Sequence, residues 1–159
     1  MSHWLRFLRW YFTPIQALRA LPNGDGAFAA FALSLALYER FIRCDLKYNQ
    51  GVSASDEVFR KAAAADLDLT YDDFVCFWEI YHNGINHQGS PKKHKKGGVV
   101  YHWEISASHG ERPVFRNEAD GSKTVTIDPW KFWEYVFRKF EQQPDILQKS
   151  DTYAFGDIY

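Results

Sequence analysis

The chain has 159 residues and a net charge of −1, and 25% of its residues are charged. This length suits one domain, and the nearly neutral charge excludes a protein that attracts nucleic acid through a global basic field. Aromatic residues make up 18% of the chain, which predicts a large core and favours a partner surface as well. The cysteines Cys44 and Cys76 fall in apolar patterns and predict reduced core thiols.

The sequence predicts neither a membrane span nor a targeting segment. Its longest apolar run, residues 27–38, is shorter than a membrane-spanning helix needs. Near the N-terminus, Arg6 and Arg9 interrupt the apolar residues, and no small-residue cleavage site follows. We therefore expect a cytoplasmic protein that does not bind a membrane.

Helical patterns fill the first half of the chain. Ser2 can cap a first helix, along which apolar residues recur at helical spacing. Asp25 is expected to cap a long helix that runs to about Tyr48 and forms the centre of the core, because it is apolar nearly all round at its start. A shorter helix is expected to open at Ser53 and Ser55, and another at Thr70.

The hydrophobic period changes after Gly97. Residues 99–105 alternate between apolar and polar side chains, which predicts a strand, and residues 112–116 could form its partner. Asp120-Gly121 predicts a hairpin turn before β-branched residues at 124–127.

A last helix and a tail complete the chain. Asp128 is expected to cap the helix, with Pro129 at its first position. The tail, residues 142–159, is predicted to be irregular and to dock through its aromatic residues, Tyr153, Phe155 and Tyr159.

Together these elements predict a single domain over residues 1–159, with a core at about 24–145 and a β insert at 97–127. The expected fold class is mainly α. It would be a helical bundle of about four or five helices, with a small β-hairpin or meander inserted before the last helix.

Two histidines, His82 and His87, lie five residues apart at the end of an apolar segment. Histidine exchanges a proton near neutral pH, so the pair could act in acid–base catalysis. Positions five apart diverge by about 140° on a straight helix, so the two would share a site only if the helix ends near Asn83-Gly84 or if two copies meet. The spacing also fits a surface histidine at 82 and a capping histidine at 87.

A basic run, Lys92-Lys93-His94-Lys95-Lys96, follows the histidines. We expect a flexible loop here, which could hold phosphate through Lys92, Lys93, Lys95 and Lys96 or could simply be solvated. Arg40 and Arg43 are further candidates to supply positive charge at the site. No His or Cys pair has metal-ligand spacing on one helix, so the sequence predicts neither a metal site nor a cofactor.

Residues 82–89, His-Asn-Gly-Ile-Asn-His-Gln-Gly, resemble the Arg-Asn-Gly-x-x-His-Gln motif of HEPN (higher eukaryotes and prokaryotes nucleotide-binding) domains. The Gly24-Asp25-Gly26 start of the long helix and the segment 127–132 are similar to bacterial members of that family. The resemblance covers about residues 24–145. It implies a four-helix bundle that dimerises, with the motif residues in a cleft between the subunits.

Many members of that family are metal-independent endoribonucleases in toxin–antitoxin or antiphage systems. By resemblance, RNA would be the substrate, His87 the acid–base group, His82 its assistant and Asn83 an orienting residue. A homodimer and an antitoxin or other defence partner would also be expected.

The sequence departs from the motif where His82 replaces the family arginine. Arginine is always charged and grips phosphate with two donors, whereas histidine is charged only part of the time. His82 could therefore work as part of a two-histidine acid–base pair. Alternatively, the site could be degenerate, which would leave a module that binds RNA, a nucleotide or a protein partner.

Overall fold

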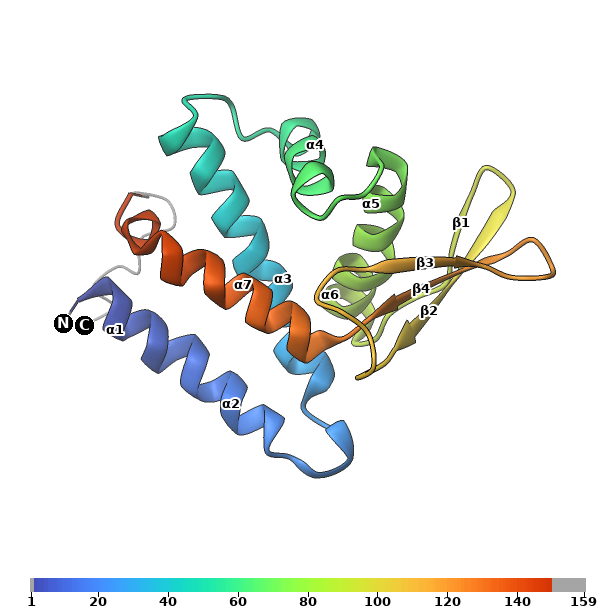
Figure 1. Cartoon of the computed structure of the whole chain (residues 1–159), viewed down its shortest axis with the longest axis horizontal. Helices are drawn as coiled ribbons and strands as arrows, with labels where there is room; N and C mark the ends of the chain where they lie inside the picture. Colours follow the sequence, from blue (N-terminus) through green and yellow to red (C-terminus); the bar gives the residue numbers. More distant parts are fainter. Residues whose placement is uncertain (1, 150–159) are drawn as a thin grey trace.

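The computed structural model describes residues 2–149 of the chain, in which helices pack side by side and a sheet lies at one end of them (Figure 1). The first helix is continuous and has a π-helical middle. Ser2 caps it by accepting a hydrogen bond from the backbone N–H of Leu5 at 3.2 Å. The three parts of this helix are α1 (His3–Phe7), the π-helical η1 (Leu8–Phe12) and α2 (Thr13–Arg19). A 3₁₀ turn, η2 (Pro22–Gly24), follows it.

The central helix α3 (Ala27–Cys44) continues as the π-helical segment η3 (Asp45–Asn49). It begins after Gly26 and has no side-chain cap, so the prediction that Asp25 caps it is wrong. Gly26 has a packing role instead, because a Cβ there would lie 2.2 Å from the carbonyl oxygen of Leu18. The backbone of α2 can therefore pass close to the start of α3.

The remaining helices begin where the sequence predicts. Ser55 accepts from the N–H of Val58, and Thr70 accepts from the N–H of Asp73. Asp128 accepts from the N–H of Trp130 at 2.9 Å, ahead of Pro129 at the first helical position. The elements are α4 (Asp56–Asp66), α5 (Tyr71–Phe77), η4 (Trp78–Asn83), α6 (Gly84–Gln88), α7 (Pro129–Gln142) and η5 (Pro144–Leu147).

The sheet has four strands in the order β1-β2-β4-β3. β2 pairs with β4 in parallel, and the two outer pairs are antiparallel. The predicted hairpin joins β3 to β4, and Gly121 in its turn has a φ of 84°. The strands are β1 (His94–Lys96), β2 (Val99–Ile105), β3 (Val114–Asn117) and β4 (Lys123–Ile127).

The expectation of a mainly α bundle with a small β insert is wrong, because the chain has an α/β fold with a four-stranded mixed sheet. The sheet is part of the core: Tyr101, Val125 and Ile127 are buried. The buried hydroxyl of Tyr81 on η4 donates to the backbone carbonyls of Glu104 and Val125, which joins the helix to two strands. The sheet also starts earlier than the predicted insert, at His94.

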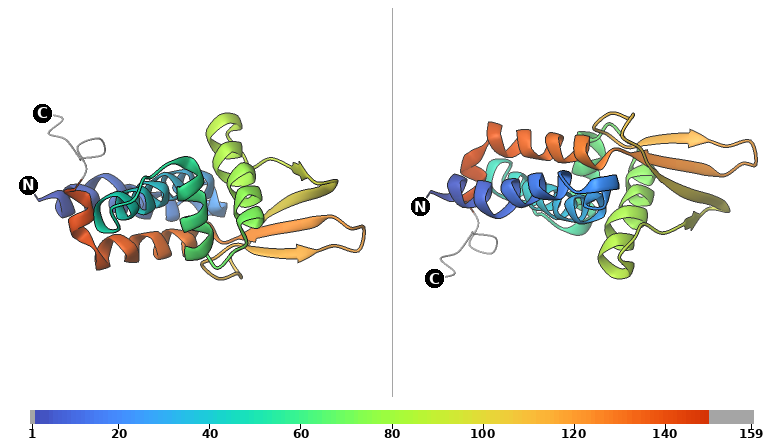
Figure 2. Two further views of the ribbon diagram at one scale, coloured as in Figure 1. Left: turned by 90° about the horizontal axis from the view of Figure 1, so that it is seen from above. Right: turned by 90° about the horizontal axis from the view of Figure 1, so that it is seen from below.

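The continuous helix α5–η4–α6 stands between the sheet and the other helices, crossing the direction of α3 and α7 (Figure 2). Much of the aromatic excess fills this junction. The ring of Phe31 on α3 lies 5.4 Å from Tyr81 and 5.4 Å from Phe132 on α7. Among residues 2–149, no helix is both long enough and apolar enough to cross a membrane.

Only part of the predicted tail falls within the described residues. The segment η5 is a 3₁₀ turn rather than an irregular stretch, and its Ile146 and Leu147 are buried. The expected docking residues Tyr153, Phe155 and Tyr159 lie outside the described part of the chain.

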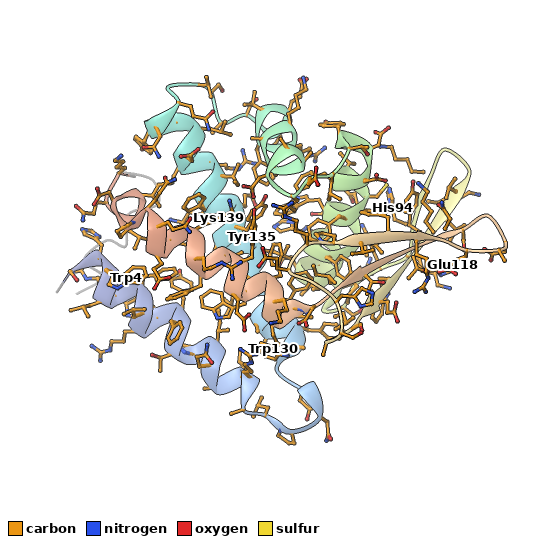
Figure 3. The ribbon with its side chains drawn as sticks, in the orientation of Figure 1. Trp4, His94, Glu118, Trp130, Tyr135 and Lys139 are labelled. Carbon is orange, nitrogen blue, oxygen red and sulfur yellow. The ribbon has the colours of Figure 1, made fainter. Side chains whose placement is uncertain are left out.

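The carboxylate of Asp66 joins three helices at the end of α4. Its Oδ2 accepts from the hydroxyls of Tyr38 on α3, at 2.8 Å, and Tyr135 on α7, at 2.7 Å. Its Oδ1 is paired with the Lys139 ammonium, one turn beyond Tyr135 on α7 (Figure 3). Burial, together with the charge of Asp66, raises the pKa of both tyrosines, so each remains a hydrogen-bond donor over a wide pH range.

We predict that Asp66→Asn lowers the free energy of unfolding by about 1–3 kcal/mol, because it removes the charge and one of the acceptors from a largely buried cluster. Urea unfolding at pH 7 would measure this change. The matched control is Asp68→Asn, at a side chain that is 90% exposed and whose left-handed backbone, with a φ of 57°, asparagine tolerates. If the two substitutions lowered the free energy of unfolding equally, the Asp66 cluster would not be a major source of stability.

Candidate functional site

His82 lies in η4, where its ring stacks on Trp78 four residues earlier. The ring centroids are 4.1 Å apart and the planes differ by 11°. The His82 side chain is 19% exposed, so it lies at the edge of the core within reach of solvent. The helix does not end at Asn83-Gly84 as one alternative required, because it continues as α6 to Gln88.

Asn83 fixes the orientation of the His82 ring. The Asn83 amide nitrogen donates to Glu79 Oε1 at 2.8 Å, so its Oδ1 must be the atom that faces His82. This oxygen lies 3.0 Å from His82 Nδ1, which therefore carries the proton and donates it. Asn83 thus favours the His82 tautomer that carries its proton on Nδ1, and Nε2 points away from Asn83.

Nε2 of His82 faces a carboxylate from another helix. It lies 3.5 Å from Oε2 of Glu39 on α3. At this distance the ring and the carboxylate form an ion pair when the imidazole is protonated. Glu39 is 26% exposed and the pair is therefore open to water. An imidazole that is oriented beside a carboxylate can give a proton to a bound group or take one from it.

Arg43 holds the other oxygen of Glu39. Its guanidinium lies 2.7 Å from Glu39 Oε1 and 2.6 Å from Asp56 Oδ1, and it lies over the ring of Phe59. Burial opposes the charge of Arg43, but the hydrogen bonds to Asp56 and Glu39 outweigh it and raise its pKa further. The same hydrogen bond lowers the pKa of Asp56. Glu39 is therefore fixed at one oxygen and presents the other to His82.

A cavity of about 340 Å³ is lined by Glu39 of this pair. Its lining combines apolar and charged side chains, which are those of Tyr11, Ala36, Leu37, Glu39, Arg40 and Arg43. Arg40, predicted as a phosphate-binding residue, thus lines the same cavity as the carboxylate that faces His82. A guanidinium on this wall could hold a phosphate group beside a group that transfers protons.

The predicted basic loop is wrong in structure, because residues 94–96 form strand β1. Lys92 joins the histidine cluster through an ion pair with Glu79 at 3.4 Å. Lys96 is 2.6 Å from Asp72 and is held there. Lys93 and Lys95 are exposed and have no ion pair with any described residue. Only Lys95 and Lys96 lie in this strand, where adjacent side chains point to opposite faces, whereas Lys92 and Lys93 precede it.

His87, predicted as the acid–base group, lies in α6 and is exposed. Within residues 2–149 its side chain has no hydrogen bond, ion pair or ring contact, and none links it to His82. The structure therefore brings together His82, Asn83, Lys92 and Arg40, through Glu79 and Glu39, and leaves His87 apart. Nor do residues 2–149 gather three or more His, Cys, Asp or Glu side chains that could hold a metal ion.

Glu79 is a functional candidate that sequence reasoning left out of the site, and Glu39 was not chosen although it stood beside Arg40. Each belongs to an i, i+4 pair on a helix: Glu79 with Asn83, and Glu39 with Arg43. This spacing is a usable signal of contact along one helix. No local signal links Glu39 to His82, because that contact depends on how α3 and η4 pack.

The glycines of the motif have structural roles. A Cβ on Gly84 would lie 2.8 Å from the backbone nitrogen of Lys92 and 2.9 Å from the carbonyl oxygen of Ser90, so the chain returns directly against the helix there. The returning segment bonds to the helix through the N–H of Lys92, which donates to the carbonyl of Ile80. Gly89 ends α6 with a φ of 75°, a conformation that favours glycine.

Gly84→Ala should destabilise the protein by about 1–3 kcal/mol, because the added methyl group meets backbone atoms that cannot move independently. Thermal or urea unfolding would measure the loss. Gly110→Ala is the control, since a Cβ there has no atom within 4 Å. If Gly84→Ala were as stable as Gly110→Ala, the backbone of residues 90–92 could not lie as close to Gly84 as described.

The pH dependence of stability should report on Glu79. Burial tends to raise the pKa of Glu79, but the hydrogen bonds from Asn83 and Lys92 outweigh it and hold the pKa below its usual value. A carboxyl with a lowered pKa in the folded state stabilises fully above its unfolded pKa, about 4.3, and loses that contribution as the pH falls through the folded value. Glu79→Gln should therefore be less stable than the wild type at pH 7 and should lose less stability below about pH 4.3.

Unfolding by urea between about pH 2 and pH 7 would test this. Glu141→Gln is the matched control, because Glu141 is exposed on α7 and has no ion pair with residues 2–149. Parallel pH profiles for wild type and Glu79→Gln would contradict the role of the Asn83 and Lys92 contacts.

Comparison with known proteins finds no matching family model, no matching curated protein and no matching solved structure. The resemblance to HEPN domains consequently depends on the sequence motifs alone, and the candidate site is defined by its own geometry.

Proposed function

We propose that the chain is a metal-independent endoribonuclease whose acid–base centre is the Glu39–His82 pair. The observation that carries the proposal is the approach of His82 Nε2 to Glu39 Oε2, 3.5 Å apart, where Glu39 lines a cavity together with Arg40 and Arg43. The site is different from the one suggested by the sequence motif, since it pairs one histidine with a carboxylate and does not include His87.

The proposed reaction uses only the groups of this site and the RNA. The 2′-hydroxyl would lose its proton to the Glu39–His82 pair as its oxygen attacks the adjacent phosphorus. The bond between phosphorus and the 5′-oxygen would then break, and that oxygen would take the proton that the pair received from the 2′-hydroxyl. Arg40 would hold the phosphate and stabilise the charge that develops on it. The products would be a 2′,3′-cyclic phosphate and a 5′-hydroxyl.

A second candidate, binding of RNA without cleavage, is favoured by one specific observation. Both ring nitrogens of His82 already face oxygen atoms of the protein, Asn83 Oδ1 and Glu39 Oε2. A ligand must displace the longer of these contacts before His82 can act on it. If the contact persists, the cavity would bind RNA without cleaving it.

The test is cleavage of a mixed pool of single-stranded and structured RNAs, with EDTA present. His82→Gln and Glu39→Gln should each lower the cleavage rate by about 100-fold or more, because each removes one member of the acid–base pair. An oligonucleotide with a single 2′-deoxy residue at the cleaved position should resist cleavage, because it lacks the attacking hydroxyl.

Two other histidine substitutions are controls in the same assay. His87→Ala and His102→Gln should retain activity within about twofold, because neither side chain has a hydrogen bond or ion pair with Glu39, His82 or Asn83. Loss of activity in His87→Ala with His82→Gln still active would overturn the assignment of the acid–base centre. RNA binding by a folded wild type that cleaves none of the pool would select the second candidate.

A further inference from the structure

The cavity of the candidate site changes from apolar to cationic along α3. Ala36 and Leu37 line it first, and Arg40 and Arg43 line it about one and two turns further along the same helix. The rise from Ala36 to Arg40 is about 6 Å. A nucleotide combines the same two kinds of surface, because a base with flat π-faces is joined through its ribose to a charged phosphate.

Tyr11 on η1 adds an aromatic ring to the lining of this cavity. The backbone of Leu18 lies against Gly26, and from this contact η1 and α3 both extend towards the left of Figure 1. Along the helices, Tyr11 lies about 10 Å from the contact, Ala36 about 15 Å and Arg43 about 26 Å. The aromatic ring therefore belongs to the apolar end of the cavity.

The Tyr11 ring is supported by its own helix. Its centroid lies 5.8 Å from that of the buried Phe7 ring, and the two planes differ by 32°. Among residues 2–149, the π-helical segments are η1, η3 and η4. Such segments are rare in proteins and often occur at functional sites. Here η1 carries Tyr11 and η4 carries His82, so two of these segments supply residues of the candidate site.

The size of the cavity suits a single nucleotide. Its volume of about 340 Å³ lies near the lower end of the range for ligand pockets, which is about 300–1,000 Å³. A base can stack on an aromatic side chain only when it is unstacked from its neighbours, as in single-stranded RNA. Because every base has a π-face, stacking on a tyrosine tolerates all four bases.

We propose that Tyr11 is the base-stacking residue of this cavity and that its ligand is an unpaired ribonucleotide. The base would stack on Tyr11 while the phosphate lies at Arg40. This inference rests on the ribonuclease function proposed above for the identity of the ligand, and it names the substrate class as single-stranded RNA with no strong preference among bases.

The test measures, by fluorescence anisotropy, the binding of a short single-stranded oligouridine in which every 2′-hydroxyl is methylated, so that it cannot be cleaved. An abasic oligomer with the same backbone is the second probe. Wild type should bind the oligouridine about tenfold more tightly than the abasic probe, because only the oligouridine can stack. Equal affinity for the two probes would overturn the proposal without the use of any variant.

Three variants assign the stacking to Tyr11. Tyr11→Ala should weaken binding of the oligouridine by about tenfold and binding of the abasic probe by less than about twofold. Tyr11→Phe keeps the ring and should bind both probes within about twofold of the wild-type affinities. Tyr71→Ala is the matched control, because Tyr71 is 40% exposed on α5 and does not line the cavity, and it should bind as the wild type does.

Binding and cleavage together separate this inference from the proposed function. If wild type cleaves RNA and Tyr11→Ala binds the oligouridine as tightly as wild type, the role of Tyr11 is wrong and the proposed function stands. If wild type binds the oligouridine through Tyr11 but cleaves no RNA, the nuclease function is wrong and the stacking role stands. A folded wild type that binds neither probe and cleaves no RNA would reject both.

Discussion

The helical layer depends on the carboxylate of Asp66, which accepts hydrogen bonds from three side chains. This carboxylate joins α3, α4 and α7 at one point through Tyr38, Tyr135 and Lys139. The hydrogen bond from Tyr38 to Asp66 restricts rotation of α3 about its axis. Glu39 is the next residue on α3 and faces His82 on η4. An interaction in the core thus fixes the geometry of a group at the surface.

Local signals in the sequence predict the helices well. Side-chain caps at Ser55, Thr70 and Asp128 and the alternating pattern of β2 describe interactions within a few residues, and the structure has each of them. Strand β1 is not predictable in this way, because a Lys-rich segment resembles a loop and becomes a strand only when β2 is available as a partner. The parallel pairing of β2 and β4 is likewise non-local, which is why the fold class was not predictable from the sequence.

The candidate site divides in the same way. His82 and Asn83 are adjacent, and their contact follows from sequence, whereas Glu39 reaches His82 across 43 positions of the chain. The motif that drew attention to the histidines has a structural explanation for its glycines, since Gly84 admits the returning chain and Gly89 ends the helix. A short motif can therefore reflect the demands of a helix end, and it places a functional residue only when a partner from elsewhere in the fold completes the chemistry.

The hydroxyl of Tyr81 has a consequence for the sheet as a whole. Its oxygen lies 2.8 Å from the carbonyl oxygen of Glu104 on β2 and 2.6 Å from that of Val125 on β4. These two strands are not joined by a hairpin, so no turn sets their alignment. A shift of either strand by one residue would move its carbonyl away from the buried hydroxyl and turn its inward side chains to the opposite face. The two hydrogen bonds of Tyr81 therefore favour one alignment of β2 with β4, and the helix that carries His82 helps to set the register of the sheet.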